Sequence, residues 1–525
     1  MQVESVLNTA AKAATYAATY AAAAAAAPRR QAAIDPLLRR QRGALLPRLT
    51  AGLVLLALLA LLASVIAYWM IEKVGVSPRQ LSPYVAKRSD KHNPAIMAVG
   101  SWAADRLMAS DRGQRDAVPA GAFRLGAQPQ GAERAASSTE VVNVDTSAAA
   151  TAAIANAKPG QAITFAPGRY RFEGKYIGAG HAGTVRNPIT VRAEQPGTVE
   201  LEFAMSEGFL VNAPYWVFEN LTIRGICEGH RDCEHAFHVV GNASHFTARN
   251  NTITDFNAHF KINGQDGAMP DDGLIEFNTL TNSSIRQTSN PVTPIDLVAA
   301  SNWVMRKNLI TDFSKSEGGR VSYGAFAKGA GKNNLFENNI VICEYKLHAP
   351  GSQQVGLSLG GGGTGKEVCR DKRCVTEQDA SIIRGNLIAS CSDEGIYINR
   401  SATSKIIHNT LIDTGGISVR FVESSADLEG NLIDGPIRLR DNAILRDTDN
   451  LSTSVSRLYL GSHPVRQLFD NGARHTLSGK LPRRAAGPEA TGIPDLCGTK
   501  ASGPHSYGAF DNFADCLRPG GASAG

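Results

Sequence analysis

The chain has 525 residues, a formal net charge of +6 and 19% charged residues. That length allows several domains or one long repeat structure. The small basic excess lies partly in the N-terminal arm, with no stripe of Lys and Arg interleaved with aromatic residues. The composition therefore argues against nucleic acid as a partner.

The N-terminal segment is Ala-rich and then Arg-rich, and we expect a disordered or weakly helical cytoplasmic arm over residues 1–50 because such a tract has little to pack against. Residues 51–71 carry no charge and are mostly Leu and Ala. A helix of that length spans roughly 30 Å, enough for a bilayer core. Arg residues precede it and the mixed pair Glu72 and Lys73 follows, so the positive-inside rule places the N-terminus in the cytoplasm.

We interpret residues 51–71 as an uncleaved single-pass signal anchor in a bacterial inner membrane, with the folded domain in the periplasm. A cleaved signal peptide is the alternative, although its apolar core would be shorter and end in a small-x-small site. Residues 72–140 are predicted to form a periplasmic stalk and linker: residues 72–95 a short helix or stalk that leaves the membrane, and residues 96–138 a linker, because they are rich in Ala, Gly, Arg and Gln with little periodicity.

The folded part is predicted to begin near Val141, and a short Ala-rich helix from Ser147 to Ala157 precedes its first strands. A helix in this position can cap the open end of a repeat structure, which otherwise exposes its core and a strand edge.

One short phrase, Asn followed by any residue and then Ile, Leu or Val, recurs at intervals of 22 to 47 residues. A fixed phrase at such spacing indicates stacked supersecondary units, and the alternating apolar residues with Gly/Asn-rich turns indicate strands. An Asn repeated at one turn can bond the backbone of the next coil. We therefore predict an all-β, single-stranded, right-handed parallel β-helix over residues 141–446. The phrase begins at Asn251, Asn278, Asn308, Asn339, Asn386, Asn409 and Asn431.

A strand precedes each phrase by about ten to twenty residues, and its second and fourth positions should point away from the core. Aligned coil by coil, these positions form two outward ladders, with rungs about 4.8 Å apart. The first ladder is His238, Lys261, Asp296, Phe326, Ser358, Tyr397, Ser418 and Arg438. The second is Val240, Asn263, Val298, Lys328, Gly360, Asn399, Arg420 and Arg440. Such a basic surface bearing Asn and Tyr suits an acidic polysaccharide laid along the stack.

Eight cysteines are an even number, which in an exported chain indicates disulfides. Cys343 and Cys391 follow the Asn phrases of consecutive coils at nearly the same offset, so they are expected about 4.8 Å apart along the stack. Metal binding is the alternative, but the short spacings match no usual zinc motif. The remaining cysteines lie near one another in sequence: Cys227 with Cys233, Cys369 with Cys374, and Cys497 with Cys516.

The opening coils resemble the chondroitinase B and alginate lyase type of β-helical polysaccharide lyase, with a pectate-lyase-like solenoid. The segments that carry the resemblance are AKPGQAITFAPGRY, GHAGTVRNPITVRAEQPGTVELEF and YWVFENLTIRG, within roughly residues 145–345. The resemblance implies uronate β-elimination, which needs a base for the C5 proton, a group that neutralises the carboxylate and an acid for the leaving oxygen.

Lys328, in AFAKGAGKNNLFENN, stands where the resembling enzymes keep their catalytic base. A cationic neighbour such as Lys261 or Arg420 can lower the pKa of a lysine. The outward ladders add Arg420, as carboxylate clamp or acid, and Asn399 as catalytic candidates, whereas the resemblance gives Lys328 alone. The resemblance identifies no substrate-binding residues. The ladders supply the candidates for that role: His238, Lys261, Asn263, Asp296 and Tyr397. A solvated surface lysine is the alternative for Lys328.

The chain departs from the resembling family at two places. Val321 and Tyr323 stand where the family keeps calcium-binding Glu residues, and the strand Gly356–Thr364 lacks the family's Arg. Its glycine run Gly360–Gly363 is either a flexible turn or a place where a ligand approaches the backbone.

Two further clusters contain residue types that bind metal ions. Calcium is the candidate cofactor for a Gly-rich loop that holds Asp266, Asp271 and Asp272, although the full alternating Asp series is missing. A His-rich segment indicates either a metal site or a hydrogen-bonded surface cluster, and we favour the second because no recognised ligand spacing is present. Its members are His230, Asp232, Glu234, His235, His238 and His259.

The Asn phrase stops near residue 446, and we expect residues 447–525 to wrap the last coil as a C-terminal cap. The sequence supports two functional hypotheses. One is a polysaccharide lyase, or a uronate epimerase, with Lys328 as base. The other is a non-catalytic carbohydrate-binding or cell-envelope assembly scaffold.

Overall fold

The computed structural model describes residues 42–112, 123–131, 138–361, 363–469, 477, 479–485, 493–500 and 503–517. The chain divides into two units, Met1–Met70 and Ile71–Gly525, and each is treated by itself below.

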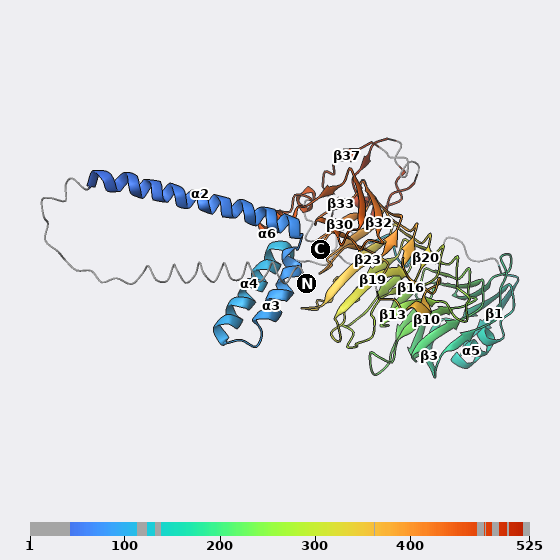
Figure 1. Ribbon diagram of the computed structural model, residues 1–525. Coiled ribbons are helices and arrows are strands. Elements are labelled where there is room, and N and C mark those ends of the chain that lie inside the picture. Colours follow the sequence, from blue (N-terminus) through green and yellow to red (C-terminus); the bar gives the residue numbers. More distant parts are fainter. Residues whose placement is uncertain are drawn as a thin grey trace. The chain divides into compact units, whose positions relative to one another are not determined.

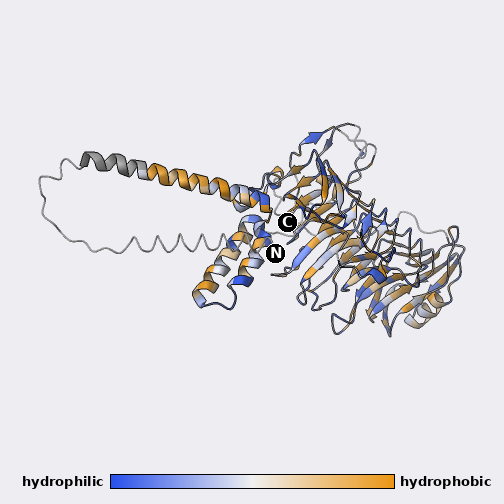
Figure 2. Cartoon of the chain, viewed as in Figure 1, coloured by the Kyte–Doolittle hydropathy of each residue, from blue (hydrophilic) through white to orange (hydrophobic). Residues whose placement is uncertain are grey.

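The first unit is dominated by helix α2 (Arg42–Val74). Its stretch Gly52–Val74 is long and apolar enough to cross a membrane, by length and composition. Figure 2 shows it as mostly hydrophobic, and side chains such as Leu53 are exposed. The predicted segment 51–71 thus lies within a longer helix. Of the predicted arm, residues 42–50 form the start of α2, and residues 1–41 lie outside the described part of the chain.

The second unit contains a solenoid of parallel strands in which each complete coil gives one strand to each of three long sheets (Figure 1). This confirms the predicted parallel β-helix, which runs from residue 140 to residue 452. The twelve-stranded sheet has the order β1 (Glu140–Val144), β2 (Gln161–Phe165), β5 (Ile189–Ala193), β8 (Trp216–Glu219), β11 (Thr247–Arg249), β14 (Leu274–Glu276), β17 (Val304–Arg306), β21 (Leu335–Glu337), β25 (Ile382–Arg384), β29 (Ser404–Ile407), β32 (Ser425–Glu429) and β35 (Ile444–Thr448).

The other two long sheets follow the same rule of one strand per coil. The eleven-stranded sheet has the order β3 (Gly168–Glu173), β6 (Val199–Ala204), β9 (Thr222–Gly225), β12 (Thr252–Thr254), β15 (Thr279–Thr281), β18 (Leu309–Thr311), β22 (Ile340–Ile342), β26 (Leu387–Ala389), β30 (Thr410–Ile412), β33 (Leu432–Ile433) and β36 (Leu451–Ser452). The ten-stranded sheet has the order β4 (Ile177–Ala179), β7 (Glu207–Val211), β10 (His235–Val240), β13 (Ala258–Asn263), β16 (Ile295–Val298), β19 (Val321–Lys328), β23 (Gln353–Leu359), β27 (Ile396–Asn399), β31 (Ile417–Arg420) and β34 (Ile437–Arg440).

Two small sheets complete the strand inventory of the described residues. A three-stranded parallel sheet, β20 (Gly331–Lys332), β24 (Gln378–Asp379) and β28 (Ser401–Ala402), follows the ten-stranded sheet in three coils, and an antiparallel pair, β37 (Arg483–Arg484) and β38 (His505–Ser506), belongs to the tail.

The repeated Asn forms a continuous buried ladder at the turn between the twelve- and eleven-stranded sheets. Asn308 shows the pattern: its Oδ1 accepts from the backbone N and Nδ2 of Asn278, at 2.9 and 3.1 Å, and its own Nδ2 donates to Ile275 O and Asn339 Oδ1. The same bonds link every consecutive pair of predicted phrases and extend one coil further, to Asn450. The Asn side-chain amides thus link neighbouring coils at the turn between these two sheets.

The residue before each ladder Asn has a positive φ, which lets the chain turn sharply between two sheets. Phe277, Lys307 and His408 hold this left-handed conformation, at φ of 56°, 56° and 51°, although it costs a non-Gly residue about 1–2 kcal/mol. The buried amide bonds next to each turn offset that strain.

The interior of the first coils is packed with stacked aromatic rings. Phe209, Phe237 and Phe260 occupy the same position on β7, β10 and β13, with ring centroids 5.2 and 5.1 Å apart. Helix α5 (Ser147–Ala155) covers the first coil with Ala150 and Ile154, which are fully buried. The predicted cap helix is therefore confirmed.

Two helices, α3 (Pro78–Ser89) and α4 (Pro94–Arg112), occupy part of the region predicted as stalk and linker, and α3 and the end of α4 are anchored on the last coils. Helix α3 falls within residues 72–95, for which a short helix or a stalk was predicted, and α4 occupies part of the predicted linker. Arg79 is 1% exposed and bonds Asp111 on α4, Asp413 after β30 and the carbonyl of Cys391. Ala-rich composition suits a helix as well as a linker, and charges that look solvated in the sequence are paired in the interior.

The described part of the tail runs along the side of the solenoid. Leu496, Ala509, Phe510 and Phe513 pack with outward residues of the eleven-stranded sheet, as do Phe123 and Leu125. These outward positions are apolar and require a cover: Leu309, Ile340, Ile342, Leu387, Ile412 and Leu432. That residues 447–525 wrap the last coil stays a prediction. In helix α6 (Val455–Tyr459) the backbone N of Ser456 bonds the carboxylate of Glu72.

All eight cysteines form disulfides, and the metal-binding alternative for them is excluded. Cys343 and Cys391 lie on adjacent coils with Cα atoms 4.9 Å apart, as the repeat predicted. The other three bonds join the neighbouring pairs, Cys227–Cys233, Cys369–Cys374 and Cys497–Cys516.

Candidate functional site

The outer face of the ten-stranded sheet carries the predicted first ladder in the predicted register. Each residue is paired with the next on the adjacent strand, from His238 through Lys261, Asp296, Phe326, Ser358, Tyr397 and Ser418 to Arg438. Of the second ladder, Val240 pairs with Asn263, Val298 with Lys328, and Asn399 with Arg420 and then Arg440. The alignment of coils by the Asn phrase, which lies outside the ten-stranded sheet, therefore predicted the pairing of that sheet's strands correctly.

Lys328 ends β19 and is half-buried, with its Nζ 4.3 Å from the centroid of the Phe326 ring. Burial lowers the pKa of Lys328, and the Lys261 charge lowers it further, while the carboxylates of Asp296 and Glu377 act in the opposite direction. A lysine in such surroundings has a larger neutral fraction than one in water and can accept a proton.

Gly361, at the start of the glycine run, packs against the Lys328 side chain. A Cβ built on Gly361 would be 2.9 Å from Cδ of Lys328, and one on Gly360 would be 1.8 Å from the carbonyl oxygen of Asn399, at a φ of +77°. Because Gly360 and Gly361 have no side chains, Asn399 and Lys328 of the same protein can pack closely against them. Glu377, which is 1% exposed, holds this segment by accepting from the backbone N of Gly361 at 3.2 Å and from Oγ1 of Thr364 at 2.7 Å.

Arg420 lies three strands from Lys328, on β31, so about 14 Å of sheet separates the two side chains. Its Nε bonds the Asp441 carboxylate, it hydrogen-bonds the Tyr397 hydroxyl, and its guanidinium lies 4.6 Å from the Phe421 ring centroid. Asn399 is only 5% exposed, and its Oδ1 has no hydrogen-bond partner in the described chain. The three catalytic candidates share one sheet face. Asn399 and Arg420 lie on adjacent strands, and Lys328 lies two strands from Asn399 and three from Arg420.

The far end of the first ladder is covered. Arg438 is 5% exposed and bonds the carbonyl of Gly75, the side chain of Gln80 and the carboxylate of Glu394. It therefore fastens the start of α3 to the last coils, and the open part of the face ends near Tyr397 and Arg420.

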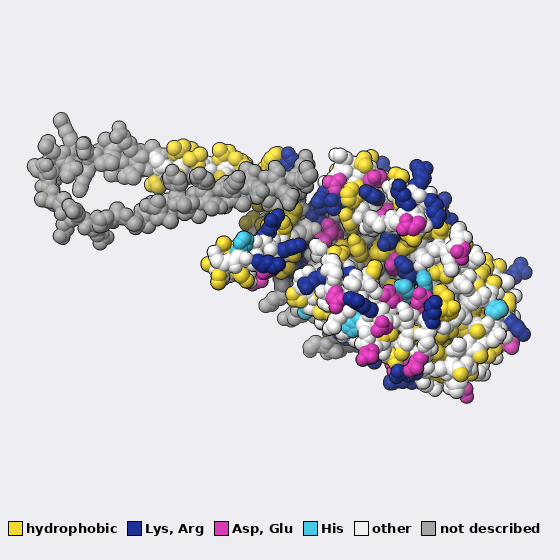
Figure 3. Space-filling model, turned by 60° about the horizontal axis from the view of Figure 1, so that its bottom comes forward, with side chains coloured by type: hydrophobic (Ala, Val, Ile, Leu, Met, Phe, Trp, Pro, Cys, Tyr) yellow, Lys and Arg dark blue, Asp and Glu magenta, His cyan; other side chains and the backbone are white. Residues whose placement is uncertain are grey.

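At the other end of the face, His238 and Lys261 each pair with an acceptor. His238 Nδ1 lies 3.0 Å from Oε2 of Glu207, and its Nε2 lies 2.9 Å from Oδ1 of Asn263. Nζ of Lys261 bonds Oδ2 of Asp296 at 2.9 Å. Four of the five predicted substrate-binding residues thus form two adjacent pairs, and on the face shown in Figure 3 basic, acidic and His side chains are interspersed.

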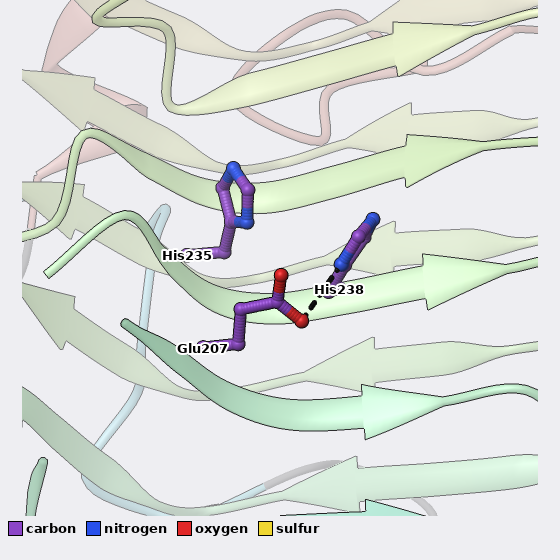
Figure 4. Close-up of side chains that lie close together, drawn as sticks. All are labelled: Glu207, His235 and His238. Atoms are coloured by element: carbon purple, nitrogen blue, oxygen red, sulfur yellow. Dashed lines mark hydrogen bonds and ion pairs between the residues drawn. The ribbon is translucent and has the colours of Figure 1, made fainter. Parts of the chain in front are cut away.

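Glu207 opens β7 and is paired across the strands with His235, which opens β10. Figure 4 shows these two side chains with His238, pointing toward one another. The hydrogen bond from His238 lowers the pKa of Glu207, and burial lowers the pKa of His235 to about 4. Near neutral pH the cluster therefore offers a carboxylate and a neutral imidazole.

The other histidines and the Asp-rich loop have separate roles. His259 is fully buried, with Nε2 2.9 Å from the carbonyl of Thr281, and Nδ1 of His230 accepts from the backbone N of Gln287. Asp271 pairs with Arg370 and accepts from Ser301 N, and Asp272 accepts from Asn302. The oxygens that the calcium expectation relied on are largely engaged by protein groups.

Sequence reasoning missed Glu207, Glu377 and Asp441. Glu207 precedes the first Asn phrase, so the alignment of the coils did not include it; in the structure the pairing of β7 with β10 places it opposite His235. Glu377 lies beyond the disulfide loop that lengthens its coil, and Asp441 follows the last strand of the sheet. Neither occupies a ladder position.

Comparisons with known proteins agree with the fold. A family model described as "Right handed beta helix region" matches residues 207–433. No curated protein is matched by sequence. Among solved structures, pectate lyase Pel9A is 16% identical, with a TM-score of 0.47, over 72% of this chain and 97% of that one. An alginate lyase from Paenibacillus sp. str. FPU-7 is 14% identical (TM-score 0.31; 60% and 100% covered), and a rhamnogalacturonan lyase is 13% identical (TM-score 0.38; 56% and 80% covered). With the three parallel sheets, the matched model establishes that this chain contains a right-handed parallel β-helix.

Proposed function

We propose that the protein acts on an acidic polysaccharide by lyase-type β-elimination, with Lys328 as the base. The observation that carries the proposal is the half-buried Lys328, whose pKa is lowered by burial, on a sheet face lined by charged and polar rungs. Pectate, alginate and rhamnogalacturonan lyases are among the solved structures to which this chain is similar, and they support this substrate class.

The neutral amine of Lys328 takes the C5 proton of a uronate, the C5–H electron pair forms the C4=C5 double bond, and the C4–O bond breaks. The departing oxygen then takes a proton from an acid or from water. Because Arg420 lies about 14 Å from Lys328, we assign it to the carboxylate of another sugar unit along the same polymer. Tyr397 and Asn399 lie between them.

We further propose that Gly52–Val74 anchors the protein in a bacterial inner membrane and that the solenoid lies in the periplasm. The apolar length of this helix and the four disulfides support this location.

A non-catalytic binding or envelope-assembly scaffold is the second candidate. Arg420 is already paired with Asp441, and Asn399 is nearly inaccessible. Val321 and Tyr323 also lack the carboxylates that the resembling enzymes use to hold calcium. These features suit a surface that binds a polymer without cleaving it.

The deciding experiment incubates the full-length protein, in detergent micelles, with alginate, polygalacturonate and chondroitin and follows the ultraviolet absorbance of the unsaturated product. We expect Lys328→Ala to reduce the rate by about 100-fold or more, in the range for loss of a general base. Lys332→Ala is the matched control because Lys332 is exposed on β20 of the same coil.

No absorbance change with any polymer, together with measurable polymer binding, supports the scaffold instead. Exchange of the C5 hydrogen in D2O without cleavage indicates an epimerase. A fully active Lys328→Ala protein refutes the role of Lys328 in either reaction.

A further inference from the structure

Three metal-ligating side chains converge where β7 and β10 begin. A carboxylate oxygen of Glu207 and one ring nitrogen each of His235 and His238 lie within 4.8 Å of one another. In Figure 4 the carboxylate lies between the two imidazoles. Two imidazoles and one carboxylate form a donor set that holds Zn²⁺ in sites that keep a further position open.

The hydrogen bonds of His238 fix which of its nitrogens faces the cluster as an acceptor. Nδ2 of Asn263 donates to the carbonyl of Gly264 at 3.0 Å, so Oδ1 of Asn263 is the atom that faces Nε2 of His238. Since Oδ1 only accepts, Nε2 carries the hydrogen. Nδ1 therefore faces Oε2 of Glu207, 3.0 Å away, and this contact requires either a second proton on the ring or a cation between the two atoms.

His235 shows the complementary arrangement. Its Nδ1 is buried and has no hydrogen-bond partner among the described residues, while its Nε2 lies 3.8 Å from Oε2 of Glu234. Both histidines thus have their inner nitrogen at the cluster; the outer nitrogen of His238 has an oxygen acceptor at hydrogen-bond distance, and that of His235 lies near a carboxylate but beyond that distance. In metal-bound histidines an outer N–H bond orients the ring and fixes its tautomer, as the bond to Asn263 does for His238.

We propose that Glu207, His235 and His238 form a binding site for a divalent transition-metal ion, Zn²⁺ foremost. Bonds of about 2.0–2.1 Å require ligand atoms about 3.3 Å apart, so the side chains rotate inward by about 1 Å when the ion binds. Glu234 and Asn263 act as positioning residues through the two rings. The nitrogen ligands favour Zn²⁺ over Ca²⁺, which prefers a shell of oxygens. The site does not depend on the polysaccharide activity proposed above.

The test uses the full-length protein, stripped with a chelator and equilibrated with Zn²⁺. Bound metal is measured by mass spectrometry after gel filtration, and affinity by competition with a chromogenic chelator. We expect about one Zn²⁺ per chain, and affinity lower by on the order of 100-fold or more in Glu207→Gln, His235→Gln and His238→Gln. Asn263→Ala should weaken binding by about 10- to 100-fold, because the His238 ring loses its acceptor.

His245→Gln is the matched control, since His245 is exposed and lies 3.9 Å from a carboxylate, that of Asp272. It should bind Zn²⁺ as the unchanged protein does. Circular dichroism of each metal-free variant checks its fold, and substituted Co²⁺ should show visible d–d absorption that the three ligand variants lack. A protein that retains no Zn²⁺, or ligand variants that bind it as tightly as the control, overturns the proposal and leaves the Glu207–His238 contact as an ion pair.

Discussion

Asn308 and Lys328 lie on the same solenoid, on two sides of it that are built differently. Asn308 is fully buried, and its bonds are repeated in coil after coil by the same residue type. Lys328 is half-buried on a face where the type of side chain and its partner vary along the sheet. The repeated Asn contact holds the coils of the scaffold together. On the face of the ten-stranded sheet no single contact repeats in this way, so its side chains are available for chemistry.

The largest effect should come from breaking the Asn ladder. In Asn308→Ala, the buried backbone N of Asn278 loses its acceptor, Nδ2 of Asn278 loses one of its three acceptors, and Ile275 O and Asn339 Oδ1 each lose a donor. Because an unsatisfied buried polar group costs about 1–3 kcal/mol, we expect the free energy of unfolding to fall by roughly 3–5 kcal/mol, measured by urea denaturation.

Asn156→Ala is the matched control, since its side chain is exposed, its φ is −115°, and its Nδ2 donates to the carbonyl of Ala152 at 2.9 Å. It should change the free energy of unfolding by less than about 0.5 kcal/mol. Equal losses in the two variants would show that the ladder adds nothing beyond an ordinary surface contact.

The same contrast explains what the sequence predicts. The Asn phrase predicted the turn, the coil length and the register of the outward ladders, because each depends on a contact that recurs. It did not predict the Asp441 pairing of Arg420 or the Glu377 contact beneath the glycine run, because each occurs once and depends on a loop conformation. The packing of α3 and α4 was missed for a similar reason, since Arg79 and Asp111 find their partners only in the folded chain.

A second effect should appear in the pH dependence of stability, where an interior histidine differs from a surface one. Burial lowers the pKa of His259 to about 4, against about 6.5 when unfolded. The folded state therefore keeps the ring neutral while the unfolded state binds a proton. Stability from this group is complete above pH 6.5 and falls by about 1.4 kcal/mol per pH unit as the pH drops toward 4.

His259→Gln should thus reduce the slope of unfolding free energy against pH by roughly one proton between pH 6 and 4.5, whatever its effect on stability at pH 7. The unchanged protein, measured in parallel, provides the reference slope. The measurement is a series of urea denaturation curves at different pH values. An unchanged slope in His259→Gln would mean that His259 titrates normally in the folded protein.

The smallest effect should come from releasing Arg420 on the outer face. Asp441 is 47% exposed and Arg420 33% exposed, so their ion pair contributes at most about 1 kcal/mol to stability. If Arg420 binds a uronate carboxylate, as proposed, Asp441 competes with the polymer for the same guanidinium. Asp441→Asn should then leave the melting temperature nearly unchanged and strengthen polymer binding by about 2- to 5-fold at low salt.

Asp427→Asn provides the control because it removes the same charge from a similar exposed pair, with Arg446, on the twelve-stranded sheet. A general increase in positive charge strengthens binding equally in both variants, whereas a specific release of Arg420 strengthens it only in Asp441→Asn. Isothermal titration with polygalacturonate separates the two outcomes. If neither variant changes the affinity, Arg420 does not contact the polymer, and the binding surface is confined to the rungs between His238 and Tyr397.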